Sequence, residues 1–135
     1  MQILVLRNVQ SKVYRIFRDR FKDINIGSPI YVSPEGLLEN VYGPKTDVWA
    51  FGVFIYELIH GDTPLAFCQN ETDLRMHIMN PIRPEAFHPS ISMDLRDLIR
   101  RCLEVNEQKR ISIHEIEQTP FMKRISMEMA MLHPL

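Results

Sequence analysis

The stretch from Thr46 to Gly61, T-D-V-W-A-F-G-V-F-I-Y-E-L-I-H-G, decides the fold of this 135-residue chain. Residues 47–60 are apolar around the whole circumference of a helix, which predicts a helix that is buried on every side. Thr46 or Asp47 can cap its N-terminus, and Gly61 stands where a left-handed C-cap belongs. We expect this helix to be the centre of one hydrophobic core.

A shorter helix is predicted over residues 71–79. Asn70 precedes it, acidic side chains lie in its first turn, and Pro81 follows it. Leu74 and Ile78 share one face, so we expect a helix that is partly exposed.

Two more helices are predicted nearer the C-terminus. Residues 95–103 repeat apolar side chains at helical spacing behind Ser92, which is typical of an amphipathic helix with an N-cap. Ser112 and Glu115 have the S-x-x-E spacing of a capping box and predict another helix start. The Met-rich residues 123–135 are expected to form a frayed or docked tail.

The N-terminal third has a different pattern. Residues 3–6 and 13–17 are short apolar or β-branched runs, which predict a hairpin with a longish loop. Residues 18–45 contain many glycines and prolines, which favour a folded loop with one short helix near 36–40. The predicted fold is therefore mainly α-helical with a small N-terminal β-hairpin.

Composition excludes several classes of protein. The chain is 45% hydrophobic and 24% charged, has a formal net charge of −1, and fits a single globular domain. The longest apolar run, residues 48–56, is far short of the roughly 18 residues that cross a bilayer. Residues 1–24 are only mildly basic, without the aromatic or glycine interleaving of a nucleic-acid arm. We therefore expect neither a membrane nor a nucleic acid as a partner.

Cysteine and histidine spacing gives no metal site. Cys68 and Cys102 are far apart and outside any C-x-x-C motif, which favours two free thiols in a reducing, cytoplasmic compartment. The histidines share no ligand spacing. They are His60, His77, His88, His114 and His133.

Four motifs occur in a fixed order along the chain. Residues 27–35 read G-S-P-I-Y-V-S-P-E, residues 42–58 contain D-V-W-A-F-G, residues 61–65 read G-D-T-P-L, and residues 106–112 read N-E-Q-K-R-I-S. Together they resemble the C-terminal lobe of a Ser/Thr protein kinase domain, from the end of the activation segment to the last helix. The last motif has Asn and Glu where the family has Asp and Pro. The resemblance covers residues 1–122 and leaves 123–135 as a tail.

The resemblance implies structural roles for several residues. The family pairs the Glu matching Glu35 with the Arg matching Arg110, and we expect that buried pair here; the alternative places both on the surface. The residue matching Asp47 bonds the backbone of the catalytic loop, but a plain helix cap is the safer prediction. Trp49, the only tryptophan, is expected in the core. Gly52, inside a buried helix, is explained by close packing against another backbone.

The resemblance also implies a substrate-side region formed by Ser28, Ile30, Tyr31 and Glu57. Ser28 matches a hydroxyl that contacts the catalytic Asp, although a turn residue is the simpler interpretation. Glu57 matches a Glu that contacts a basic substrate residue in some members. A structural role beside an arginine is an equal alternative.

Most of the apparatus for phosphoryl transfer has no match in the sequence. The five glycines, at 27, 36, 43, 52 and 61, form no G-x-G-x-x-G motif. Arg18 and Arg20 stand where the family has the metal-binding Asp and its Gly, and a cation cannot bind Mg²⁺. We therefore predict no catalytic or metal-binding residue and no cofactor for this chain alone, although the family implies ATP and Mg²⁺. We expect Met1 to begin inside the domain.

Three functions remain open. The chain is a piece of a Ser/Thr kinase that is inactive in isolation, or a pseudokinase-like protein-binding module, or a decayed remnant. In the second case a protein or peptide would bind at the activation-segment groove, residues 28–35, and at the helix predicted over 71–79.

Overall fold

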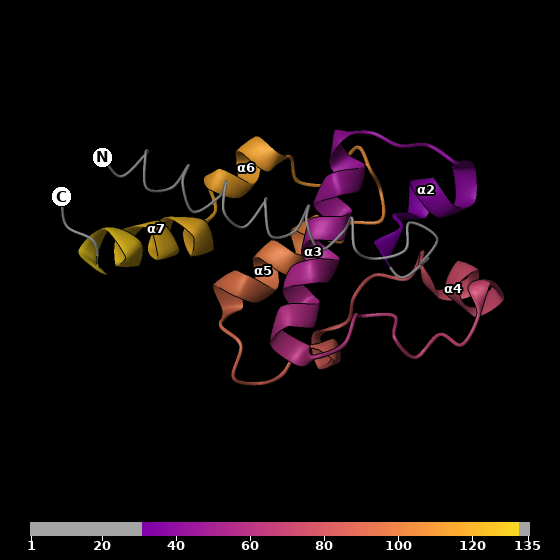
Figure 1. Ribbon diagram of the computed structural model, residues 1–135, viewed down its shortest axis with the longest axis horizontal. Helices are drawn as coiled ribbons and strands as arrows, with labels where there is room; N and C mark the ends of the chain where they lie inside the picture. Colours follow the sequence, from indigo (N-terminus) through magenta and orange to yellow (C-terminus); the bar gives the residue numbers. More distant parts are fainter. Residues whose placement is uncertain (1–30, 133–135) are drawn as a thin grey trace.

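The computed structural model describes residues 31–132. Six α-helices and one 3₁₀ helix follow in order within this range (Figure 1). They are α2 (Pro34–Glu39), α3 (Pro44–His60), α4 (Glu71–His77), the 3₁₀ helix η2 (Pro84–Ala86), α5 (Met93–Cys102), α6 (Ile113–Glu117) and α7 (Pro120–Leu132). Residues 31–132 contain no strand, so the mainly α prediction is confirmed; the predicted hairpin lies outside the described residues.

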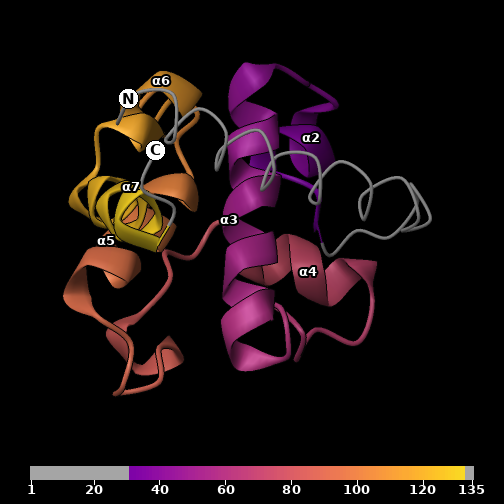
Figure 2. The same ribbon diagram turned by 60° about the vertical axis from the view of Figure 1, so that its left-hand side comes forward.

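Helix α3 is the spine of the molecule. Figures 1 and 2 show α2 and α4 on one side of α3, and α5, α6 and α7 on the other. Seven of its residues are buried: Val48, Trp49, Ala50, Gly52, Val53, Phe54 and Tyr56. The segment predicted as the centre of the core is therefore at the centre.

Two groups of buried residues pack against α3, and α5 contributes to both. Trp49 and Val53 belong to the first group, and Val48 belongs to the second. The other members of the first are Tyr31, Tyr56, Ile78, Phe87, Ile99 and Leu103. The other members of the second are Leu98, Cys102, Ile111, Ile116 and Met122. Side chains from one helix thus hold both halves of the fold together.

The N-terminus of α3 differs from the prediction. The helix begins at Pro44 with Gly43 as its N-cap, so neither Thr46 nor Asp47 is the cap. Proline is favoured at the first helical position because its missing N–H has no partner there anyway. The Thr46 hydroxyl instead accepts a hydrogen bond from the backbone N–H of Gly43 at 3.0 Å. At the other end, Gly61 has a φ of 83° and caps the helix in the left-handed conformation, as predicted.

Burial of α3 on every side was also wrong for its last turn. Leu58 is 60% exposed and Ile59 is 39% exposed, whereas Val48 is only 1% exposed. The helix ends at the surface, where the chain turns at Gly61. An apolar sequence therefore predicts the central helix, but it does not predict at which residue that helix leaves the core.

Helices α5 and α6 start behind their predicted caps, and α4 starts behind Asn70. The side chains of Asn70, Ser92 and Ser112 each accept a hydrogen bond from a backbone N–H three residues later. Helix α4 ends at His77, two residues before the predicted end. Helix α2 covers 34–39 in place of 36–40.

The C-terminal residues extend a helix of the fold. Helix α7 crosses residue 122, the predicted boundary between domain and tail, and runs on to Leu132. It contacts α5 and α6, with Met122 and Ser126 buried. The described part of the predicted tail is therefore helical and docked at its start, whereas Met131 near its end is exposed.

Candidate functional site

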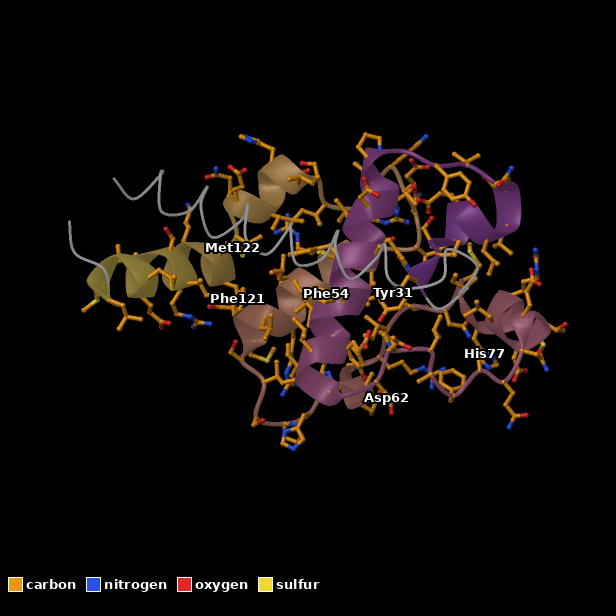
Figure 3. All side chains as sticks on the ribbon, in the orientation of Figure 1. Tyr31, Phe54, Asp62, His77, Phe121 and Met122 are labelled. Carbon is orange, nitrogen blue, oxygen red and sulfur yellow. The ribbon has the colours of Figure 1, made fainter. Side chains whose placement is uncertain are left out.

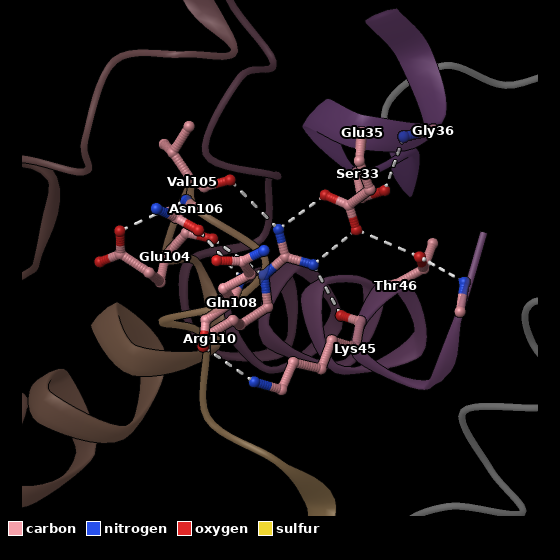
Figure 4. Close-up of polar contacts among 11 residues, drawn as sticks. Ser33, Glu35, Gly36, Lys45, Thr46, Glu104, Val105, Asn106, Gln108 and Arg110 are labelled. Carbon is pink, nitrogen blue, oxygen red and sulfur yellow. Dashed lines mark hydrogen bonds and ion pairs between the residues drawn. The ribbon is translucent and has the colours of Figure 1, made fainter. Parts of the chain in front are cut away.

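A buried ion pair joins two segments that lie 75 residues apart. Arg110 Nη1 donates to Glu35 Oε2 at 2.8 Å, and Arg110 Nη2 donates to Glu35 Oε1 at 2.8 Å (Figure 4). The Arg110 side chain has no exposed surface and that of Glu35 is 6% exposed. This two-point geometry is the strongest form of the arginine–carboxylate contact.

The guanidinium group of Arg110 uses all of its N–H groups. Besides Glu35, it donates to the carbonyl oxygens of Glu104 at 2.8 Å, Lys45 at 2.7 Å and, more distantly, Val105 at 3.5 Å. Its central carbon lies 5.2 Å from the centre of the Trp49 ring. A buried charge stabilises a fold only when its hydrogen bonds are satisfied, and that condition is met here.

The carboxylate of Glu35 has a second anchor in α3. The Thr46 hydroxyl donates to Glu35 Oε2 at 3.1 Å while accepting from Gly43. Ser33 is the N-cap of α2, and its side chain accepts a hydrogen bond from the Gly36 N–H at 3.1 Å, which fixes the helix that carries Glu35. The segment before α3 is therefore tied both to the start of α3 and to the loop before α6.

Opposing effects act on the ionisation of Glu35. Burial alone would raise the pKa of its carboxyl group. The hydrogen bonds and the positive charge of Arg110 lower it. Further hydrogen bonds from the backbone of Glu35 and from the Ser33 side chain act in the same direction, so the pKa of Glu35 lies below its usual value. The carboxylate is therefore the charged form that the fold requires.

The predicted substrate-side residues are only partly within the described range. Ser28 and Ile30 lie outside it. The Tyr31 hydroxyl donates a hydrogen bond to the Glu57 carboxylate. Among residues 31–132, Glu57 therefore faces a tyrosine. Sequence reasoning missed this contact because no periodic pattern connects two residues so far apart in different elements.

Asp47, Trp49 and Gly52 occupy three different environments. Asp47 lies in the first turn of α3, where its side chain makes no hydrogen bond with residues 31–132, and partial burial raises the pKa of its carboxyl group. Trp49 is buried in the core as expected from its size. A Cβ added to Gly52 would lie 2.6 Å from Cβ of Cys102 and 3.1 Å from Leu103 Cδ2. The close packing at Gly52 is thus against side chains of the α5 segment and not against a backbone.

No group of three or more His, Cys, Asp or Glu side chains within residues 31–132 could hold a metal ion. No helix in this range is both long and apolar enough to span a bilayer.

Comparisons with known proteins give a consistent result. Residues 10–122 match the model of the protein kinase domain. The chain is 37% identical over 107 residues to calcium-dependent protein kinase SK5 of Glycine max. This alignment covers 76% of the chain and 20% of that kinase. The chain is 34% identical over 113 residues to serine/threonine-protein kinase PAK 1 of Mus musculus, covering 82% and 20% respectively. A calcium-dependent protein kinase of rice, number 28, is 37% identical over 101 residues, covering 73% and 18%. The chain thus spans about a fifth of the length of these relatives.

Proposed function

Since the chain belongs to the protein kinase family, we propose that it is the substrate-side lobe of a Ser/Thr protein kinase domain and that it transfers no phosphate by itself. The family activity is transfer of phosphate from ATP to protein hydroxyl groups. The observation that carries the proposal is the buried Glu35–Arg110 pair, which holds the segment ending at Glu35 against the helical core. That arrangement suits a lobe that presents a loop to a protein substrate.

Inactivity in isolation follows from the residues that phosphoryl transfer needs. The sequence has no Gly-rich phosphate loop, and Arg18 and Arg20 stand at the positions that match the metal-binding motif. A guanidinium group repels Mg²⁺ where the family uses a carboxylate. The chain therefore lacks both the contacts for the nucleotide phosphates and those for the metal.

A nucleotide-binding assay tests this proposal. We expect no thermal shift and no binding heat when the 135-residue chain is titrated with Mg-ATP, and no label on a mixed protein substrate from radioactive ATP. A complete Ser/Thr kinase domain in the same buffer is the positive control. A reproducible rise of several degrees in the midpoint would overturn the role assigned to Arg18.

A second candidate is a pseudokinase-like binding module, with a decayed remnant as the other alternative. Arg18 and Arg20 favour the binding module and the remnant over a piece of an active kinase. A shortened chain would lack the segments before Met1, but shortening would not replace a metal-binding Asp by an arginine. Translation of genomic DNA upstream of Met1 separates the possibilities. An open frame that encodes a Gly-rich loop and a catalytic Asp supports a piece of an active kinase, whereas its absence supports the other two.

We propose a protein or peptide as the partner of this lobe, bound at the activation-segment groove around residues 28–35 and at α4.

We also propose the cytoplasm as its compartment, because free thiols are typical of a reducing environment. Cys68 and Cys102 are both free thiols, and burial raises the pKa of Cys102 to about 12, which leaves it unreactive.

A further inference from the structure

A short turn, residues 87–91, joins η2 to α5. Phe87 and Ile91 at its two ends are buried, and the residues between them are exposed. The guanidinium group of Arg96 in α5 donates to the carbonyl oxygens of three residues of the turn, at distances of 3.0 to 3.2 Å. Because an arginine stays charged at any ordinary pH, the carbonyl side of the turn is held by a group that does not titrate.

The backbone N–H groups of the turn are bonded differently. All but one of those that exist are bonded within residues 84–91. The N–H group of His88 instead donates to Nε2 of His60, the last residue of α3, at 3.2 Å. The contact between the turn and the end of α3 therefore depends on the protonation state of one imidazole.

The imidazole ring of His60 is held in one orientation. It stacks on the ring of Tyr56, with the ring centres 3.9 Å apart and an angle of 17° between the planes. Its Nδ1 lies 3.0 Å from the carbonyl oxygen of Tyr56. A carbonyl oxygen can only accept, so Nδ1 carries a proton; a backbone N–H can only donate, so Nε2 carries none. The ring is therefore neutral while both hydrogen bonds are made.

A second proton on His60 can bind only at Nε2. It would turn the acceptor of the His88 N–H into a donor, and the two donors would face each other. Nδ1 would keep its bond to Tyr56, and a positive ring is favoured both by the tyrosine face and by the C-terminal end of α3. The protonated ring therefore stays in place, and the turn is the part that is released.

Other charged groups lie on the three elements around the turn. In α5, Arg96 bonds the turn and Arg100 lies over the aromatic ring at its start. In α3, Glu57 accepts from a tyrosine hydroxyl. Glu85 of η2 and Asp62, which Figure 3 shows at the end of α3, are exposed. No carboxylate within residues 31–132 forms an ion pair with the imidazole of His60, which makes only the contacts described above.

His88 is the second imidazole of the turn, but its surroundings accept either charge state. Its Nδ1 lies 2.6 Å from the hydroxyl oxygen of Ser90 and 3.1 Å from the Ser90 backbone nitrogen. A hydroxyl group can donate to a neutral ring and accept from a charged one. Protonation of His88 therefore leaves a hydrogen bond at this point, unlike protonation of His60.

We propose that residues 87–91 form a pH-sensitive turn, which His60 holds closed while it is neutral and releases when it is protonated. An imidazole changes its charge between about pH 5 and pH 8, so the turn responds within the physiological range. The Arg96 contacts remain, and the expected change is a local loosening before α5 without unfolding of the chain. Neither nucleotide nor substrate enters this inference, which goes beyond the proposed function and can fail independently of it.

Nuclear magnetic resonance of the ¹⁵N-labelled 135-residue chain tests the proposal. At pH 7.5, imidazole correlation spectra should show His60 with its proton on Nδ1. Between pH 7.5 and pH 5.5, the protection factor of the His88 amide against hydrogen exchange should fall threefold or more, because its hydrogen bond is lost. The amide of Leu103, which donates to Ile99 in the core, is the internal reference and should stay protected. The fall should follow the titration of the His60 nitrogen signals.

Three variants assign the effect to one ring. His60→Gln places an amide that does not titrate at the end of α3, so the protection of the His88 amide should no longer depend on pH. His88→Gln leaves His60 in place, and the fall in protection at position 88 should persist. His114→Gln changes an exposed histidine of α6 and is the matched control, which should behave as the unaltered chain does.

The proposal would be overturned by any of three results. A proton on Nε2 of His60 at pH 7.5 would contradict the assigned hydrogen bonds. Constant protection of the His88 amide from pH 7.5 to pH 5.5 would show that the turn does not respond. An unchanged fall in His60→Gln would assign the response to another group. Should that variant fail to fold, the unaltered chain still decides, because a fall that does not follow the His60 signals also contradicts the proposal.

Discussion

Two regions of the molecule meet at Trp49 and differ in how completely their polar groups are paired. On one side the Arg110 guanidinium group lies over the indole ring, with hydrogen bonds to Glu35 and to three carbonyl groups. On the other side the same ring lines a cavity whose rim carries Glu85 and Arg83, without partners among residues 31–132. Closed polar networks fix a fold, whereas apolar hollows with unpaired rims are suited to binding. The ion pair therefore contributes to stability, whereas the rim of the cavity adds no ion pair among residues 31–132.

Removal of the Arg110 side chain should cause the largest loss of stability. Arg110→Ala should lower the free energy of unfolding by about 3 kcal/mol, because it leaves the Glu35 carboxylate buried and unpaired. Urea unfolding measures the loss. Arg124→Ala is the matched control, since Arg124 pairs with Asp94 at 3.1 Å but both side chains are substantially exposed. The control should change stability by less than about 1 kcal/mol. A loss below about 0.5 kcal/mol for Arg110→Ala would mean that the pair does not hold the fold.

A second variant tests the packing of the spine that both regions share. Gly52→Ala should destabilise by about 2 kcal/mol, because the added Cβ would lie 2.6 Å from Cβ of Cys102 and α5 would have to move. On an exposed helix the same change stabilises by about 1 kcal/mol, so the expected sign is the reverse of helix propensity. Thermal and urea unfolding decide the sign. Increased stability would show that α3 and α5 are not in close contact at this point.

The effect of pH sharpens the contrast between the two regions. The pKa of Glu35 is lower in the folded chain than its usual value of 4.5, so its contribution to stability is complete above pH 4.5 and is lost as pH falls through the folded pKa. Glu35→Gln should therefore destabilise by about 1.5 kcal/mol at pH 7 through the weaker bond to Arg110. That difference should shrink below pH 4.5 in urea unfolding. A difference that is constant from pH 7 to pH 3 would exclude a lowered pKa for Glu35.

Much of the helical framework could be predicted from local sequence. The apolar residues of α3 and the caps at Gly61, Asn70, Ser92 and Ser112 all depend on neighbours within one or two turns. The start of α3 was misplaced because Thr46 and Asp47 look like caps, while Pro44 at the first helical position sets the true start. Local signals thus find helices more reliably than they find the ends of helices.

The sites depend on contacts that local patterns do not encode. Glu35 and Arg110 are 75 residues apart, and only the resemblance to a family suggested that they pair. The contact of Tyr31 with Glu57 had no such guide. The cavity was not predicted at all, because its lining comes from α3, α4, η2 and the residue after α5, whose relative positions follow from tertiary packing.

The smallest expected effect on stability lies on the cavity side. Phe67→Ala should change the free energy of unfolding by less than about 0.5 kcal/mol, because the side chain is 61% exposed and its ring lies edge-on to His77, with 5.0 Å between the ring centres. Urea unfolding of the variant and of the unaltered chain measures the difference. A loss of stability above about 0.5 kcal/mol would show that Phe67 contributes to the structural core.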